Sequence, residues 1–363
     1  MSVNQLATSI NLAGLKLFKN KFEDHSDVFS PLSCHLGLTG VLFGTAGGAQ
    51  QELSKALEIA AVDEKLVENF KNILTLSNYE DTSTKVSFVN AIYIQDGWKL
   101  KDEYLSIASQ LFDVVTANFR NAADEANNIN QYVSEHTAGK MNQLLLESDI
   151  DDETKTILVN ALYFKSKWHL PFEQYSTKQK NFTTLNGTTI DVQMMYQTET
   201  FPYYEDSNVH VIKLAYEGKK YSMLVVLPKN DPQYLFPTIE QYNQYCKKCE
   251  YEEVKLYFPK FKHEVKTSLV PYFNQLGVSQ LFDVGGLQNM HPELKLDDII
   301  HAVFIDVDEN GTEAAASTAI MMCEESCCLS AKIPKIFNAN KTFSYLIRDT
   351  QNNVILFAGV HNG

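Results

Sequence analysis

The most informative part of this sequence is the run Glu309-Asn310-Gly311-Thr312-Glu313-Ala314-Ala315-Ala316-Ser317-Thr318, which consists mainly of small residues. Gly311 permits backbone angles that other residues avoid. Beyond it, positions 312, 314, 316 and 318 alternate with 313, 315 and 317, the period of two that is typical of a strand. Such a strand has no large side chains to bury, but it could enter a gap between two existing strands. The alternatives are an exposed alanine-rich loop and the first turn of a helix, because alanine favours helices.

The residues that follow, 321–332, show neither the helical nor the strand period. A segment of this length without regular structure is uncommon inside a compact domain, and such segments are usually functional. We therefore expect an exposed functional loop directly after the run of small residues.

Length and composition favour one folding unit. The chain has 363 residues, of which 44% are hydrophobic, and it contains no Gly/Ser-rich or Pro-rich linker and no internal repeat. These values are ordinary for a globular protein with a large core. We expect residues 1–363 to form a single domain.

The net charge of −14 disfavours the basic surface that nucleic acid or an anionic membrane requires, so we expect neither as a partner. No stretch approaches the roughly 20 apolar residues of a membrane-spanning helix, and the N-terminus lacks the continuous apolar run of a signal peptide. We expect a cytoplasmic protein, with secretion by a route that uses no signal peptide as the alternative.

Six cysteines are present, and without a secretory signal we interpret them as thiols. Cys246 and Cys249 have the CxxC spacing of zinc and redox sites, but a second CxxC and a suitably spaced histidine are absent. We expect no metal site. A regulator that responds to zinc or to thiol oxidation through this pair remains an alternative function.

Hydrophobic periodicity places helices mainly in the first half of the chain and strands mainly in the second, which favours an α+β fold. The clearest expected helices are 3–20, 50–59, 127–135 and 269–276. The clearest expected strands are 86–95, 156–164, 211–216, 221–227, 254–261, 302–307, 342–347 and 354–359.

The sequence contains none of the common catalytic or cofactor-binding motifs. GxSxG, HExxH, GxGxxG, the phosphate-binding loop and paired CxxC motifs are all absent. We therefore expect neither an enzyme nor a bound cofactor.

Several motifs, in their order along the chain, are similar to those of the serpin family over nearly the whole length. They are Phe29-Ser-Pro-Leu-Ser33, Asn90-Ala-Ile-Tyr93, Thr137-Ala-Gly-Lys-Met141, Asn160-Ala-Leu-Tyr-Phe-Lys-Ser-Lys-Trp168, Ser222-Met-Leu-Val-Val-Leu-Pro228, Phe258-Pro-Lys-Phe261, Gly311-Thr-Glu-Ala-Ala-Ala316 and Phe343-Ser-Tyr-Leu-Ile-Arg348. The chain resembles the intracellular branch of the family.

The resemblance implies an α+β serpin fold with three β-sheets, eight or nine helices and an exposed reactive-centre loop. Residues 309–318 would be the hinge of that loop. A target protease would cleave the loop and form an acyl-enzyme, and the hinge would then insert into the main sheet and trap the protease. We expect a monomer, in which insertion of one molecule's loop into another's sheet could produce polymers.

Family spacing places the reactive bond at Glu325-Ser326. A loop one residue shorter would place it at Glu324-Glu325. The loop is longer than is usual for the family, so Met322-Cys323 and Leu329-Ser330 are alternatives.

The resemblance also assigns two sets of supporting residues. One is a buried polar cluster where the main sheet opens: Ser30, Ser33, Asn160 and His301. The other is the place where insertion begins, formed by Trp168, Lys260 and Glu309, with an expected ion pair between the last two.

The leading interpretation is a suicide inhibitor of serine or cysteine proteases. The main alternative is a non-inhibitory serpin that acts as a binding or storage protein. Such a protein would be expected to carry bulky or charged hinge residues, whereas the expected inserting face here is uncharged.

Overall fold

The computed structural model describes residues 2–77, 80–312 and 333–363. Several predicted residues lie outside the described residues: the hinge residues Glu313, Ala314, Ala315, Ala316, Ser317 and Thr318, and every candidate reactive bond, including Glu325-Ser326. Within the described ranges, no helix combines the length and apolarity needed to cross a membrane.

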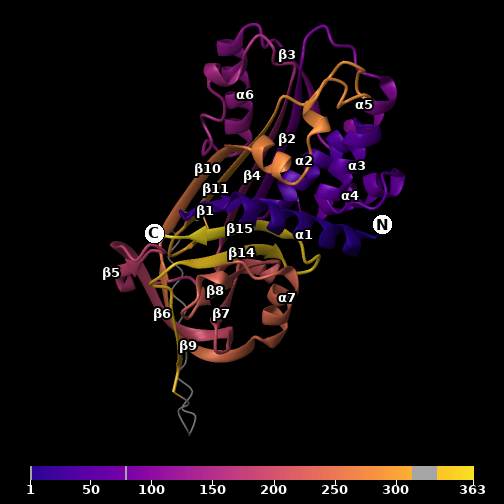
Figure 1. Ribbon diagram of the computed structural model, residues 1–363. Coiled ribbons are helices and arrows are strands. Elements are labelled where there is room, and N and C mark those ends of the chain that lie inside the picture. Colours follow the sequence, from indigo (N-terminus) through magenta and orange to yellow (C-terminus); the bar gives the residue numbers. More distant parts are fainter. Residues whose placement is uncertain (1, 78–79, 313–332) are drawn as a thin grey trace.

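The described residues form eight α-helices, most of them in the first half of the chain, as the periodicity predicts (Figure 1). They are α1 (Val3–Lys21), α2 (Pro31–Phe43), α3 (Gly47–Ala56), α4 (Glu64–Ser77), α5 (Asp102–Ala108), α6 (Ala122–His136), α7 (Ile239–Lys248) and α8 (Val270–Gln275).

Fifteen strands occur in the same ranges. They are β1 (Asp27–Phe29), β2 (Thr84–Gln95), β3 (Asp113–Ala117), β4 (Thr156–Lys167), β5 (Lys178–Thr183), β6 (Thr189–Glu205), β7 (Val209–Ala215), β8 (Tyr221–Pro228), β9 (Glu250–Pro259), β10 (Phe261–Ser268), β11 (Asp298–Val307), β12 (Gly311–Thr312), β13 (Lys335–Asn338), β14 (Phe343–Asp349) and β15 (Ile355–His361).

The six-stranded sheet has the order β10-β11-β12-β4-β2-β3. Over most of their length β11 and β4 pair directly and in parallel, from Asp298 opposite Ile157 to Phe304 opposite Tyr163. Only at the far end do they separate, and there the two-residue strand β12 lies between them. The main sheet is therefore closed along 298–304 and open at one end.

The other strands form a nine-stranded network, in which the long β6 joins two groups. β6 pairs with β9 from Met194 to Tyr203 and with β7 from Tyr203 to Glu205. One group contains β5, β9 and β13, and the other contains β7, β8, β14, β15 and β1. Together with the six-stranded sheet, these two groups correspond to the three sheets that the resemblance implies.

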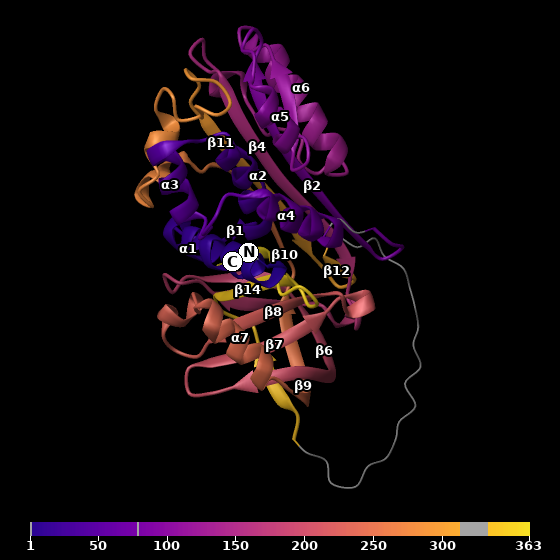
Figure 2. The same cartoon turned by 90° about the vertical axis from the view of Figure 1, so that its right-hand side faces the viewer.

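The main sheet is covered on both faces, as the apolar run 156–164 predicts. Leu158 and Leu162 of β4 belong to the large core beneath α2, whereas Val159 and Ala161 contact the smaller core beneath α6. Figure 2 shows α2 and α6 on opposite sides of β4 and β2. Side chains that point to alternate faces of β4 thus enter different cores.

One predicted strand is wrong in its extent. The expected strand 254–261 is two strands, because β9 ends at Pro259 and β10 begins at Phe261 in the other sheet. Proline has no N–H to donate to a ladder, and the chain crosses between the sheets at Lys260. This crossing places Lys260 beside the open end of the main sheet.

Candidate functional site

The strand β12 occupies the open end of the main sheet. Thr312 lies opposite Val307 of β11 and Ser166 of β4, and Gly311 lies opposite Lys167. A Cβ atom at Gly311 would lie 2.1 Å from the carbonyl oxygen of Ser166, so the close approach of the two strands requires glycine. The predicted hinge therefore begins as a strand, and the helical alternative is wrong for these two residues.

The side chain of Thr312 points into the protein. It is fully buried, and its hydroxyl lies 2.6 Å from the hydroxyl of Tyr216. The ring of Tyr216 stacks on Trp168, with ring centroids 4.5 Å apart. Because strand side chains alternate, the face of the hinge that begins with Thr312 would contact the core if β12 were extended.

Trp168 and Phe172 hold the turn before β12 through backbone atoms. The N–H of Trp168 donates to the carbonyl of Asn310 (2.8 Å), and the N–H of Phe172 donates to the carbonyl of Glu309 (2.8 Å). The indole N–H of Trp168 donates to the carbonyl of Asp308 (3.0 Å). Residues 308–310 are thus fixed by the segment that follows β4.

The side chain of Glu309 forms the ion pair expected from the sequence. Its Oε2 lies 2.8 Å from the Lys260 ammonium, and its Oε1 accepts a hydrogen bond of 2.7 Å from Thr177. The Glu309 side chain is 5% exposed, whereas that of Lys260 is 38% exposed. Burial acts to raise the pKa of the Glu309 carboxyl, but the hydrogen bonds from Lys260 and Thr177 keep that pKa below its usual value.

The four residues of the predicted polar cluster also meet, at the middle of the main sheet. His301 of β11 and Asn160 of β4 are paired across the ladder. The Ser30 N–H donates to Nε2 of His301 (3.1 Å), so Nδ1 carries the proton and donates to Oδ1 of Asn160 (2.6 Å). Ser33 contributes its carbonyl, which accepts from the Asn160 amide at 2.5 Å.

Asn90 belongs to this cluster but was not predicted as part of it. It lies opposite Asn160 on β2, and its side-chain oxygen accepts a hydrogen bond from the Asn160 amide. Asn90 interrupts the apolar run 86–95 in the same way that Asn160 interrupts 156–164. That shared interruption is the sequence signal that points to Asn90.

Burial keeps the cluster uncharged. The pKa of His301 is lowered to about 3 by burial and by the nearby positive charge of Lys21. The ring of His301 packs against Phe29, with centroids 4.7 Å apart.

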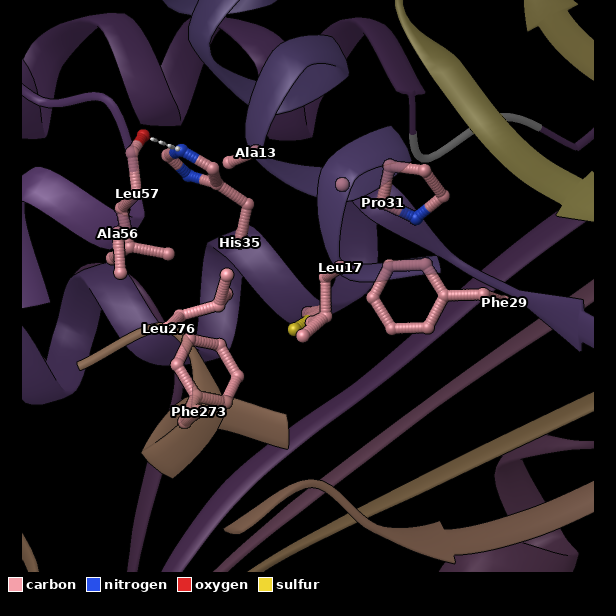
Figure 3. A pocket seen from close by; sticks show the side chains of 11 residues that line it. Ala13, Leu17, Phe29, Pro31, His35, Ala56, Leu57, Phe273 and Leu276 are labelled. Carbon is pink, nitrogen blue, oxygen red and sulfur yellow. Dashed lines mark hydrogen bonds between the residues drawn. The ribbon is translucent and has the colours of Figure 1, made fainter. Parts of the chain in front are cut away.

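The cavity beside Phe29 has a volume of only about 10 Å³ (Figure 3), space for at most one water molecule. This region is a packed core and does not have the volume of a ligand site.

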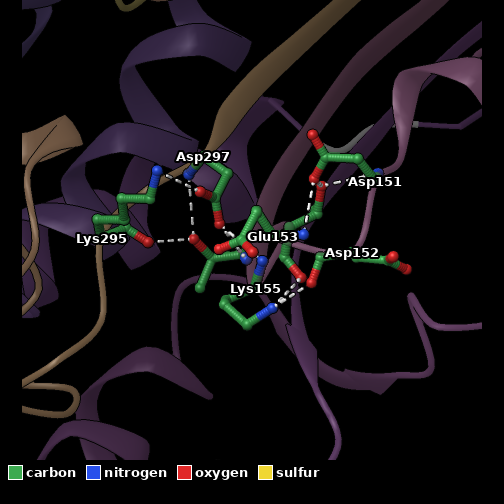
Figure 4. A network of polar contacts seen from close by, with 8 residues as sticks. Asp151, Asp152, Glu153, Lys155, Lys295 and Asp297 are labelled. Carbon is green, nitrogen blue, oxygen red and sulfur yellow. Dashed lines mark hydrogen bonds and ion pairs between the residues drawn. The ribbon is translucent and has the colours of Figure 1, made fainter.

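A second polar network joins β4 and β11 at the end of the strand pair that lies away from β12 (Figure 4). The Asp297 carboxylate accepts hydrogen bonds from the N–H groups of Lys155 (2.7 Å) and Thr156 (2.9 Å), and it lies 3.0 Å from the Lys295 ammonium. Asp297 immediately precedes β11, and Lys155 immediately precedes β4. This network therefore marks the closed end of the strand pair.

The two cysteines of the CxxC pair lie in different surroundings. Cys246 accepts a hydrogen bond of 3.0 Å from Arg348, and burial raises the pKa of Cys249 to about 12. A thiol with such a pKa is a poor nucleophile at neutral pH. No group of three or more potential metal ligands occurs among the described residues.

Comparison with known proteins agrees with this geometry. The family model described as Serpin (serine protease inhibitor) matches residues 8–362. A serpin-like protein of Thermococcus kodakarensis is 32% identical, covering 98% of this chain and 84% of its own length. Leukocyte elastase inhibitor of Equus caballus is 30% identical, covering 98% of this chain and 99% of its own length.

Solved serpin structures have the same fold. Native tengpin, a thermophilic serpin, superposes with a TM-score of 0.88 at 23% identity, covering 98% of this chain and 94% of its own. Human thyroxine-binding globulin superposes with a TM-score of 0.90 at 23% identity, covering 99% and 98%. The family match over residues 8–362, together with relatives that are 30% or more identical over nearly the whole chain, shows that the chain belongs to the serpin family.

Proposed function

We propose that this protein is a suicide inhibitor of serine or cysteine proteases, and that it acts by inserting its cleaved loop between β11 and β4. The observation that carries the proposal is β12, which already lies between these two strands while they remain paired along 298–304. We further propose that it is not an enzyme, because its loop would supply the bond that the protease cleaves and its main sheet would hold the trapped protease.

The register of β12 defines a path for insertion. If β12 were extended, each residue after Thr312 would lie opposite the preceding residue of β11 and of β4. Six residues after Thr312, the strand would reach the polar cluster. Thr318 would then lie between His301 and Asn160, which now contact each other. Insertion would break their hydrogen bond of 2.6 Å, and the Thr318 hydroxyl is a replacement partner of the right chemistry.

The energy of the added strand is sufficient to drive this change. β11 has 10 residues, and a strand along its length would replace one ladder by two. At roughly 1 kcal/mol net for each added hydrogen bond, the gain is on the order of 10 kcal/mol. This gain is comparable with the stability of a whole domain, so the closed state would be kept by a kinetic barrier.

The composition of the proposed hinge favours an inhibitor over a binding or storage serpin. The inserting face continues from buried Thr312 with Ala314, Ala316 and Thr318. None of these residues carries a charge that would have to be buried during insertion. This composition supports the inhibitory interpretation. Proteins similar to this chain are named leukocyte elastase inhibitor, which also supports it.

We propose Glu325-Ser326 as the reactive bond, with Glu324-Glu325, Met322-Cys323 and Leu329-Ser330 as alternatives. The first two would select a protease that accepts an acidic residue, and the others a chymotrypsin-like enzyme.

We also propose that residues 1–363 form one domain, because one core cluster contains residues from α1 to β15, and that the protein is a monomer. The free thiols of Cys34, Cys246 and Cys249 suit a reducing, cytoplasmic compartment.

The experiment is to mix the protein with a panel of serine and cysteine proteases, to look for a complex that resists denaturant, and to sequence the cleaved loop. A covalent complex whose cleaved end lies at one of the four named bonds is the expected result. Cleavage by every protease without a covalent complex would overturn the proposal and indicate a non-inhibitory serpin.

A further inference from the structure

A cavity of about 200 Å³ lies behind the turn that precedes β12. Its walls come from the segment after β4 and from β6, β7 and β8. Trp168, Phe172 and Phe201 supply buried aromatic surface, and Tyr251 is 75% exposed. Cavities lined by aromatic side chains with a few polar groups are typical of small-molecule sites.

The inner wall contains a hydroxyl group without a partner. Ser222 is fully buried, and its Oγ makes no hydrogen bond to any residue that the structure describes. A buried hydroxyl without a partner is unfavourable, and native proteins contain few of them. A polar group of a ligand at this wall would satisfy it.

The cavity also has unpaired positive charge. Lys213 on β7 and Lys219 in the turn before β8 both line it, and neither has an ion-pair partner within residues 2–77, 80–312 and 333–363. The chain as a whole carries a net charge of −14. Two unpaired ammonium groups beside an aromatic cavity favour an anion with a flat apolar body.

We propose that this cavity is a binding site for a small aromatic carboxylate. The aromatic ring would pack between the Trp168, Phe172 and Phe201 side chains, and the carboxylate would face Lys213 and Lys219. The residues that line the cavity do not include those of the polar cluster around His301.

Occupancy would also affect the hinge, an extension that rests on the proposed inhibitory function. Trp168 and Phe172 line the cavity and, through their N–H groups, hold the carbonyls of Asn310 and Glu309. A ligand that binds this arrangement more tightly than the inserted state stabilises the closed sheet and slows insertion.

The test is calorimetric titration of the intact full-length protein with cinnamate and with its neutral counterpart, cinnamamide. We expect one saturable site for cinnamate and affinity about tenfold weaker for the amide, because only the acid pairs with lysine. Lys213→Gln and Lys219→Gln should each weaken cinnamate binding about threefold or more, and exposed Lys55→Gln should leave it unchanged. Ala215→Leu, checked for folding by circular dichroism, fills the cavity and should abolish binding.

Equal affinity for the acid and the amide, or cinnamate binding that survives Ala215→Leu, would overturn the proposal. Absence of binding to the wild-type protein would do the same. Binding is measured without a protease, so a failure of protease trapping would refute the inhibitory function and leave this site standing. Trapping whose rate is unchanged by saturating cinnamate would refute only the coupling to the hinge.

Discussion

Asn160 and His301 face each other across β4 and β11 and share a hydrogen bond of 2.6 Å at the middle of the closed main sheet. Each is fully buried, and each also contacts the segment around the start of α2 through Ser33 or Ser30. The two strands that would separate in the proposed insertion are therefore joined by side chains as well as by the backbone.

We predict that Asn160→Ala destabilises the closed protein by about 3 kcal/mol, because it leaves the His301 N–H and the acceptors of Ser33 and Asn90 without partners. The measurement is the urea midpoint of unfolding. Asn181→Ala, at an exposed position of β5, is the control and should change stability by less than about 0.5 kcal/mol. Equal midpoints for the two variants would contradict the assigned cluster.

The cluster should also make stability depend on pH. In the folded protein burial lowers the pKa of His301 to about 3, compared with 6.5 for an ordinary histidine. Between these values the unfolded chain binds a proton that the folded chain does not. Stability from this residue is therefore complete above about pH 6.5 and is lost toward pH 3, by about 1.4 kcal/mol per pH unit.

The check is the pH dependence of the free energy of unfolding in His301→Gln. The slope between pH 6 and pH 4 should decrease by about one proton relative to the wild type. His263, whose pKa burial also lowers to about 3, contributes a second proton, so the double variant should lose about two. An unchanged slope in both variants would show that neither histidine is neutral in the folded protein.

Much of the fold could be predicted from the sequence, and so could the Glu309–Lys260 pair and the cluster around His301, but several further contacts that hold the site could not. The runs 86–95 and 156–164 are apolar on both faces, so their place in a covered sheet follows from pattern alone. The pairing of Asn90 with Asn160 depends on long-range register, which a single sequence does not display. The break at Lys260 was missed because 254–261 continues in strand-like composition across Pro259.

The hinge illustrates the same division. Small alternating residues indicated a strand, and the structure places Gly311 and Thr312 in one. The second partner of Glu309, Thr177, lies 132 positions away in the sequence and has no local signal. Likewise Asp297 looks like an ordinary turn residue, although its carboxylate joins the starts of β4 and β11.

We predict that Lys260→Gln affects the rate of loop insertion more than stability. Lys260 is partly exposed, and such pairs contribute about 1 kcal/mol or less to folding. Without it, the buried carboxylate of Glu309 keeps only Thr177 as a side-chain partner, which loosens the start of β12. The measurement is the rate at which inhibitory activity is lost on mild heating.

The matched control is Lys262→Gln, which removes an exposed pair with Glu264 outside the hinge. Lys260→Gln should lose activity several-fold faster than this control, with an unfolding midpoint that is nearly the same. If the two variants lose activity equally fast, the Glu309–Lys260 pair does not restrain the hinge.

At the other end of the strand pair, Asp297→Ala should loosen the closed sheet. It removes the acceptor for the N–H groups of Lys155 and Thr156, at a cost of about 2 kcal/mol. Hydrogen exchange should increase at the start of β4, around Ile157 and Leu158. Asp191→Ala, which removes an exposed contact with Gln179, should leave exchange there unchanged. Equal exchange in both variants would show that Asp297 does not hold the closed end of the main sheet together.

The central claim is that trapping depends on inserting the face that begins at Thr312. Its most direct test is the ratio of covalent complex to cleaved protein for Thr312→Arg and Thr312→Ser, with the protease that the wild type traps best. Arginine places a charge at a fully buried position, whereas serine keeps the hydroxyl next to Tyr216. We predict that the arginine variant is cleaved as a substrate with almost no complex, and that the serine variant traps nearly as well as the wild type. Undiminished trapping by Thr312→Arg would contradict the account.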